Sequence, residues 1–253
     1  MKILLANDDG IEAKGIQVLY ECLAKEHEVY VIAPDSNRSA TSHHITMYGN
    51  YTLKSYKKNQ WMITGLPVDC VCLGLTSDFF DFKFDLVISG INKGANMGTD
   101  IVYSGTCGAA RQAVLNGVPA IALSVNPEVW DEEHINALKY DAIADFAAKN
   151  LETLASLASI DPPRIFVNVN GESLDSYKGV KYCKELCIRD YGDKLHVHKN
   201  EGEMNVDFIP GGAVPRYDER CDAIVTKQGY IAVSRVYADP LAANGVDGIQ
   251  FKL

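Results

Sequence analysis

Two adjacent carboxylates, Asp8 and Asp9, come one residue after a short apolar run, Ile3–Ala6, and precede Gly10. Neighbouring carboxylates repel each other unless a cation or a proton lies between them, so this pair could hold a divalent metal ion. Alternatively, an aspartate here could cap the next helix, because Asp accepts hydrogen bonds from the first N–H groups of a helix and Gly10 suits a tight turn. The pair alone does not separate metal binding from capping.

Further oxygen-bearing side chains follow other apolar runs. Ser39 ends the sequence DSNRS at 35–39, and Asn92 lies in GINKGAN at 90–96. Taken singly, Ser39 could be a turn residue and Asn92 a left-handed position, which Asn tolerates. Together with Asp8 and Asp9 they form an all-oxygen set of two carboxylates, a hydroxyl and an amide. Such a set suits Mg²⁺ or Mn²⁺ rather than zinc and favours metal binding.

A glycine between two hydroxyl residues, Ser104-Gly105-Thr106, precedes an alanine-rich helical pattern. At the N-terminus of a helix these residues would offer amide and hydroxyl donors to a phosphate group. The alternative is that Ser104 or Thr106 only caps the helix. The chain has no G-x-x-x-x-G-K-[ST] sequence, and its first turn lacks the G-x-G-x-x-G spacing, so NTPase and dehydrogenase functions are disfavoured.

Two other pairs could bind a metal ion. His196 and His198 would share one face of a strand, and Cys183 and Cys187 have helical spacing. Neither is accompanied by a second pair at zinc-finger spacing, which disfavours a zinc site. The seven cysteines are odd in number and include no C-x-x-C pair, so we expect reduced, mostly buried thiols.

The elements that must position these residues alternate between strand and helix patterns. Strands are expected at 2–7, 28–33, 85–89, 119–124 and 164–169, and helices at 15–25, 106–116 and 133–160. This alternation predicts a parallel, doubly wound α/β sheet flanked by helices. In such a sheet the loops at the carboxyl ends of the strands open on one edge, where ligands bind. We therefore expect the four polar segments to face one site.

The remaining segments do not follow this alternation of strand and helix. Apolar and polar residues alternate along residues 51–64 without a helical period, which predicts a hairpin. The pattern of Leu66–Leu75 predicts a short helix that begins at Pro67. After Gly171 short alternating stretches are separated by Gly and Pro, and another strand is expected at Gly229–Val236. The sequence thus predicts a catalytic core at 1–170 and a β-rich C-terminal region at 171–253.

Composition excludes several classes of protein. The 253 residues include 33 acidic and 24 basic side chains, for a net charge of −9, and 47% are hydrophobic. These values are typical of a globular chain and exclude disorder. The negative charge argues against nucleic-acid polymers and anionic membranes as partners. The first apolar run is too short for a signal-peptide core, and no 18 consecutive residues are apolar, so we expect a cytoplasmic protein.

Four segments together resemble the SurE family, the stationary-phase survival proteins that are 5′/3′-nucleotidases. They are NDDG at 7–10, APDSNRSA at 33–40, SGINKGANMG at 89–98 and YSGTCGAA at 103–110. The resemblance is strong over roughly the first 125 residues. It implies a Rossmann-like fold and hydrolysis of nucleoside 5′- and 3′-monophosphates, with short polyphosphate as a lesser substrate.

The resemblance also implies roles for particular residues. One Mg²⁺ or Mn²⁺ ion per subunit would be held by Asp8, Asp9, Ser39 and Asn92. The phosphate would bind at Asn96, Ser104, Gly105 and Thr106, and the catalytic residues would be Asp8, Asp9, Asn96 and Ser104. The C-terminal segment of the family is exchanged between subunits, so we expect a homodimer or homotetramer in which residues after about Gly229 cross to a neighbour.

Two other functions are compatible with parts of this pattern. A receiver-type signalling domain also places paired carboxylates after its first strand, but it needs a phosphorylatable Asp where this chain has Ser89–Asn92. A non-catalytic nucleotide-binding module would keep the phosphate loop and could dispense with the acidic pair. The sequence predicts neither the preferred nucleobase nor a preference between 5′- and 3′-monophosphates.

Overall fold

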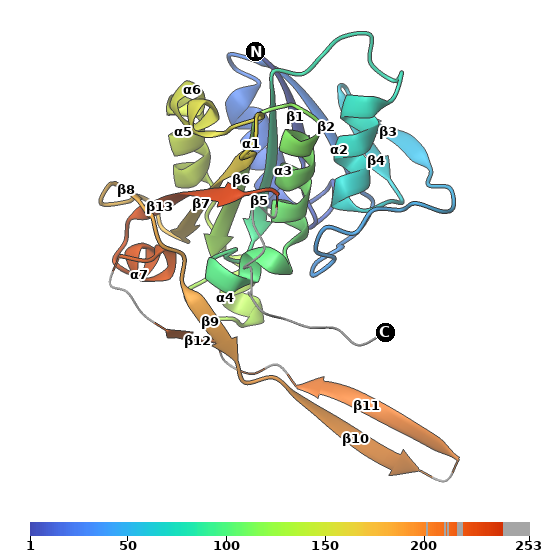
Figure 1. Cartoon of the computed structure of the whole chain (residues 1–253), viewed down its shortest axis with the longest axis vertical. Coiled ribbons are helices and arrows are strands. Elements are labelled where there is room, and N and C mark those ends of the chain that lie inside the picture. The colour runs from blue at the N-terminus through green and yellow to red at the C-terminus, as the bar shows by residue number, and fades with distance from the viewer. Residues whose placement is uncertain (201, 210, 212, 217–219, 240–253) are drawn as a thin grey trace, which may run out of the picture.

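A large, mostly parallel sheet forms the centre of the protein (Figure 1). The computed structural model describes residues 1–200, 202–209, 211, 213–216 and 220–239. The strands of the sheet are β1 (Lys2–Ala6), β2 (Glu28–Pro34), β3 (Leu53–Lys57), β4 (Gln60–Ile63), β5 (Leu86–Lys93), β6 (Ala120–Asn126), β7 (Ile165–Glu172), β8 (Val180–Tyr182) and β13 (Ile231–Tyr237). Their order across the sheet is β3-β4-β2-β1-β5-β6-β7-β13-β8.

Helices cover both faces of this sheet. They are α1 (Lys14–Leu23), α2 (Pro67–Thr76), α3 (Gly105–Leu115), α4 (Glu132–Asn136), α5 (Asp141–Lys149), α6 (Leu151–Leu157) and α7 (Asp222–Lys227), with a 3₁₀ helix η1 (Gly98–Val102). Successive side chains of a strand point to opposite faces. In β1, Ile3 and Leu5 pack in the layer of α1, α5 and α6, whereas Leu4 and Ala6 pack in the layer of α2 and α3.

The direction of chain progress across the sheet reverses at β1. The chain passes from β1 to β2 on one side and later returns to β5 on the other side, and β1 is parallel to both. The predicted parallel α/β sheet is therefore confirmed. A crevice at the carboxyl ends of the strands beside such a reversal is the usual ligand site of this architecture.

Two local predictions are confirmed and one is wrong. β3 and β4 pair as an antiparallel hairpin, and α2 begins at Pro67. The single helix expected at 133–160 is instead three helices, α4, α5 and α6. The chain turns between α4 and α5 so that Leu138 and Tyr140 both enter the core, and the Asn150 side chain ends α5 by donating to the Phe146 carbonyl.

The C-terminal region joins the central sheet and also extends beyond it. β13 pairs antiparallel with β7 of the same chain, so the expected exchange from about Gly229 onward does not hold for this strand. The rest of the predicted exchange segment, 240–253, lies outside the described residues. The strands β9 (Ile188–Tyr191) and β12 (Ala213–Arg216) pair with each other. The proposed domain boundary at residue 170 stays a prediction.

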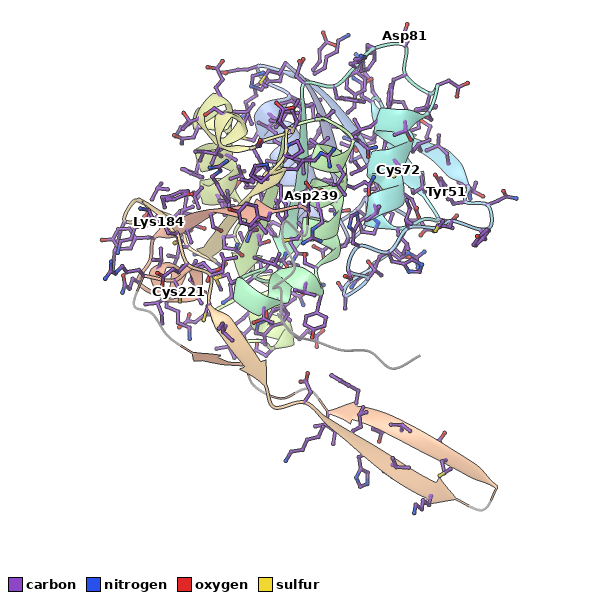
Figure 2. The ribbon with its side chains drawn as sticks, in the orientation of Figure 1. Tyr51, Cys72, Asp81, Lys184, Cys221 and Asp239 are labelled. Atoms are coloured by element: carbon purple, nitrogen blue, oxygen red, sulfur yellow. The ribbon has the colours of Figure 1, made fainter. Side chains whose placement is uncertain are left out.

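A two-stranded hairpin of β10 (Lys194–Asn200) and β11 (Glu203–Ile209) projects away from the rest of the chain (Figure 1). Figure 2 shows that its side chains extend into solvent, away from the rest of the chain. One face carries five apolar side chains that are 45–70% exposed, Leu195, Val197, Met204, Val206 and Phe208. We call these five residues the hairpin apolar face. An isolated two-stranded hairpin is at best marginally stable in water, so this face is expected to be covered.

Among the residues that the structure describes, no helix has both the length and the apolar character needed to cross a membrane. None of the seven cysteines forms a disulfide bond in the described structure.

Candidate active site

The loop after β1 is held in shape by its own first residue. Asn7 is fully buried, and its side-chain amide both donates to the Gly10 carbonyl (2.8 Å) and accepts from the Gly10 N–H (3.2 Å). Gly10 has φ +103°, a conformation that favours glycine. The next helix, α1, begins later, with Ala13 as an N-cap that makes no side-chain bond. The alternative that Asp8 or Asp9 caps this helix is therefore wrong.

Asp8 lies where three segments meet. Its Oδ1 accepts from the Thr106 hydroxyl at 2.6 Å, and its backbone carbonyl accepts from the Arg38 N–H at 2.7 Å. A Cβ atom on Gly105 would lie only 3.0 Å from Asp8 Oδ2, so the carboxylate rests directly on the first turn of α3. Burial raises the pKa of Asp8, which is 3% exposed, while bonds from the hydroxyl and N–H of Thr106 act in the opposite direction.

Asp9 connects the same loop to the end of β5. Its Oδ2 accepts from the Lys93 N–H at 2.8 Å, directly after Asn92. Its Oδ1 is buried and has no hydrogen-bond partner among the described residues. Burial and then the charge of Asp8 raise the pKa of Asp9 to about 6, although the Lys93 N–H lowers it. A buried carboxylate oxygen without a partner is an atom that a cation would satisfy.

The two neutral oxygen donors line the same cavity as Asp8. Asn92 is 8% exposed and donates from its amide nitrogen to the Gly94 carbonyl at 2.8 Å, so its amide oxygen is the atom that a cation would contact. Ser39 is exposed, and both its N–H and its hydroxyl donate to Asn37 Oδ1, at 2.8 and 2.6 Å. These bonds leave the lone pairs of the Ser39 hydroxyl free to accept a ligand.

A cavity of about 890 Å³ opens above these loops. Five of the predicted residues line it, Asp8, Ser39, Asn92, Asn96 and Ser104. Asp9 instead lines a neighbouring cavity of about 280 Å³, together with Tyr140. Lys93, whose N–H donates to Asp9, lines both cavities and so forms part of the wall between them.

The start of α3 combines capping with exposure to the cavity. The Ser104 hydroxyl accepts from the Cys107 N–H at 2.9 Å, so Ser104 is the N-cap that the sequence offered as an alternative. Its hydroxyl hydrogen remains available as a donor, and the residue lines the cavity. Thr106 is fully buried with its hydroxyl on Asp8, and this side chain does not line the cavity.

Asn96 is fixed by three buried residues that the sequence analysis missed. Its N–H donates to Asn170 Oδ1 (2.8 Å), and its carbonyl accepts from the side chains of Asn168 (2.8 Å) and Asn170 (3.1 Å). Its own amide nitrogen donates to the Ser124 hydroxyl at 2.8 Å. The available signal was the presence of polar residues inside otherwise apolar strands, because buried polar groups need partners.

The alternative metal pairs do not gather a larger ligand set. The rings of His196 and His198 lie 4.5 Å apart on the exposed hairpin, and His198 contacts Asp207 at 2.6 Å. Cys183 and Cys187 belong to separate apolar clusters. Within the described residues, no group of three or more His, Cys, Asp or Glu side chains is placed to hold a metal ion. The set predicted around Asp8 includes only two such residues, Asp8 and Asp9, because its other members, Ser39 and Asn92, are neutral oxygen donors.

Comparison with known proteins gives consistent matches. The family profile described as Survival protein SurE matches residues 3–191. A protein of Polaromonas naphthalenivorans (strain CJ2) named 5′-nucleotidase SurE is 36% identical over 243 residues, which cover 94% of this chain and 92% of that protein. A protein of Treponema pallidum (strain Nichols) with the same name is 42% identical over 187 residues, 73% of this chain and 97% of that protein. The crystal structure of the Sure protein from Aquifex aeolicus superposes with a TM-score of 0.79 at 28% identity, covering 95% of this chain and 94% of that one.

Proposed function

The chain belongs to the SurE family, and from that premise we propose that it is a 5′-nucleotidase, which hydrolyses nucleoside 5′-monophosphates to a nucleoside and phosphate. The observation that carries this function is the convergence of Asp8, Asn92, Asn96 and Ser104 on one cavity at the reversal point of the sheet. We extend the proposal to 3′-monophosphates and, as lesser substrates, short polyphosphates.

A divalent cation, Mg²⁺ or Mn²⁺, is the cofactor that we propose, one per subunit, held by Asp8, Asp9, Ser39 and Asn92. Two features of the chain fit a cation: the donor set is entirely oxygen, and Asp9 Oδ1 is buried without a partner in the described residues. Burial raises the pKa of both carboxyls, and the charge of Asp8 raises that of Asp9 further, which fits a pair that a cation would neutralise. When bound, the ion would withdraw charge from the phosphate and make a water molecule more acidic.

The residues on the other side of the cavity are suited to the phosphate. Ser104 has a hydroxyl hydrogen to donate, and the amide of Asn96 has one hydrogen beyond the one that it gives to Ser124. Buried hydrogen bonds fix the positions of both donor side chains, so the donors need little rearrangement to stabilise the charge that develops on the phosphate oxygens. We propose Asn96, Ser104 and the N–H groups of Gly105 and Thr106 as substrate-binding groups, and Asp8, Asp9, Asn96 and Ser104 as the catalytic residues.

Phosphate release from a panel of 5′- and 3′-nucleoside monophosphates and short polyphosphate tests this proposal. Each substrate is assayed after EDTA treatment and again with Mg²⁺ or Mn²⁺ restored. We expect no turnover with EDTA and recovery with either ion, and we expect Asn92→Ala to lose activity by orders of magnitude while the protein stays folded. Full activity after EDTA would remove the metal from the proposal. Absence of turnover under every condition would favour a non-catalytic nucleotide-binding module.

We also propose that the protein self-associates and that it is located in the cytoplasm. The hairpin apolar face is exposed on the single chain, and coverage by a second copy would bury it, which supports a homodimer or homotetramer. Seven cysteines without a disulfide bond in the described structure favour a reducing compartment, so we propose that the protein acts in the cytoplasm.

A further inference from the structure

The large cavity has two chemically different ends. Polar side chains of the proposed metal and phosphate site form one end. Three aromatic side chains line the cavity elsewhere: Tyr103 follows η1, Trp130 precedes α4, and Phe208 belongs to β11. These residues remain 57%, 62% and 61% exposed, more than is usual for large aromatic side chains.

Trp130 lies against the backbone next to Asn92, one of the proposed metal ligands. A Cβ atom on Gly94 would lie 2.7 Å from Cη2 and 2.9 Å from Cζ2 of the indole, so the ring rests on the Gly94 backbone. The Gly94 carbonyl in turn accepts the hydrogen bond from the Asn92 side chain. Gly94 has φ +118°, and a side chain there would displace the indole. One part of the ring is therefore fixed beside Asn92 while most of the residue stays accessible.

Trp61, the other tryptophan of the chain, has a structural role and provides a comparison for Trp130. Trp61 packs edge-to-face against Phe79 and Phe80, with ring centroids 5.2 and 5.5 Å away, in the layer that covers the outer strands. Trp130 makes no such ring contact with any described residue. Its exposed aromatic surface lines the cavity and is not stacked on another ring of the described part of the chain.

We propose that Trp130 stacks on the nucleobase of the substrate. This inference rests on the proposed function, because it requires a nucleotide whose phosphate lies at the polar end of the cavity. Stacking on an aromatic ring is tolerant of base identity, since every base has a π-face. The site would accept purine and pyrimidine nucleotides, with the larger purine rings bound more tightly. Phe208 is less suited to this role because it lies on the hairpin apolar face, which self-association would cover.

Steady-state kinetics with two substrates separate stacking from a structural role. The Mg²⁺-loaded wild type and Trp130→Ala, Trp130→Phe and Trp61→Phe variants are assayed with AMP and with ribose 5-phosphate, which lacks the base. We expect Trp130→Ala to raise KM for AMP about tenfold and leave KM for ribose 5-phosphate unchanged. Trp130→Phe should recover most of the loss, and Trp61→Phe should resemble the wild type. An equal loss on both substrates, or no change on either, would overturn the stacking role.

Fluorescence tests the same contact without turnover. The chain has two tryptophans, so Trp61→Phe leaves Trp130 as the sole indole emitter. The phosphonate analogue of AMP should quench this emission, and the phosphonate analogue of ribose 5-phosphate should not. This result would support stacking even if the nucleotidase assay failed, because it needs binding alone. Saturable binding of the AMP analogue by calorimetry without any change in emission would place the base elsewhere, and failure of the analogue to bind at all would overturn the inference as well.

Discussion

The hydroxyl of Thr106 donates to Oδ1 of Asp8 across 2.6 Å, although 98 residues separate them in the chain. Both residues are buried, and the bond joins the first turn of α3 to the end of β1. The resemblance assigned Thr106 to phosphate binding. The structure directs its hydroxyl to a proposed metal ligand, so we expect this side chain to act by orienting Asp8.

Replacement of Thr106 by Val keeps the shape of the side chain and removes this hydrogen bond. We expect Thr106→Val to weaken Mg²⁺ binding and activity by 10- to 100-fold, about the usual cost of losing a partner of a metal ligand. Calorimetric titration with Mg²⁺ and phosphate release from AMP measure the two effects. Thr106→Ser, which keeps the hydroxyl, should restore both. Unchanged Mg²⁺ affinity in the Val variant would contradict the orienting role.

Neutralising Asp9 should separate stability from activity. The pKa of this carboxyl rises from 3.8 to about 6 in the folded protein, so the fold favours its protonated form, and stability falls as pH increases through that range. At pH 7.5 Asp9→Asn should therefore raise the free energy of unfolding of the metal-free protein, by on the order of 1 kcal/mol. The same variant should lose activity by orders of magnitude. Urea unfolding in EDTA and phosphate release from AMP check the two outcomes.

Added Mg²⁺ provides the control for that experiment. A ligand that binds only the folded state raises Tm, so Mg²⁺ should stabilise the wild type and have little effect on Asp9→Asn. An equal rise in Tm for both proteins would show that Asp9 is not a ligand.

Asn170 should support catalysis through Asn96. Its side chain bonds to both the N–H and the carbonyl of Asn96, at 2.8 and 3.1 Å. Asn170→Leu removes both bonds, and we expect it to lower kcat at least tenfold and the free energy of unfolding by about 2–3 kcal/mol. Ser124→Ala removes only the bond to the Asn96 side chain, so it should lower kcat with a smaller loss of stability. Loss of activity only in proportion to the unfolded fraction would contradict the positioning role.

The hairpin offers a matched pair of substitutions for self-association. Val197 lies on the hairpin apolar face, and His196 lies beside it on the opposite face. Val197→Lys should dissociate the assembly because it would place a charge in the covered face, whereas His196→Lys should not. Sedimentation velocity distinguishes these outcomes. If the wild type is a monomer at the concentrations used for assay, the proposed assembly is wrong.

The buried parallel strands could be predicted from sequence because each is covered on both faces and therefore reads as an apolar run. The break between α4 and α5 could not, because Leu138 satisfies the same helical spacing whether it lies in a helix or in a turn that enters the core. Short elements such as α7 have too few residues to show a period.

Some residues of the candidate site could likewise be predicted from the sequence, and others could not. Asp8 and Asn92 could be placed together because Asp8 follows β1 and Asn92 lies at the carboxyl end of β5, its neighbour at the reversal of the sheet. The support of Asn96 could not, because it depends on the register of β6 and β7, which pairs Ser124 with Asn170. Only that register brings an alcohol and an amide from separate strands to the same loop residue.

Phe208 belongs both to the hairpin apolar face and to the wall of the large cavity. An assembly that covers this face would therefore also complete or constrict one side of the cavity. Assembly and substrate binding would then share a free energy of coupling, which acts equally in both directions. Specific activity would depend on enzyme concentration, and occupancy of the cavity would shift the protein between its oligomeric forms. The hairpin would make the catalyst sensitive to its own abundance.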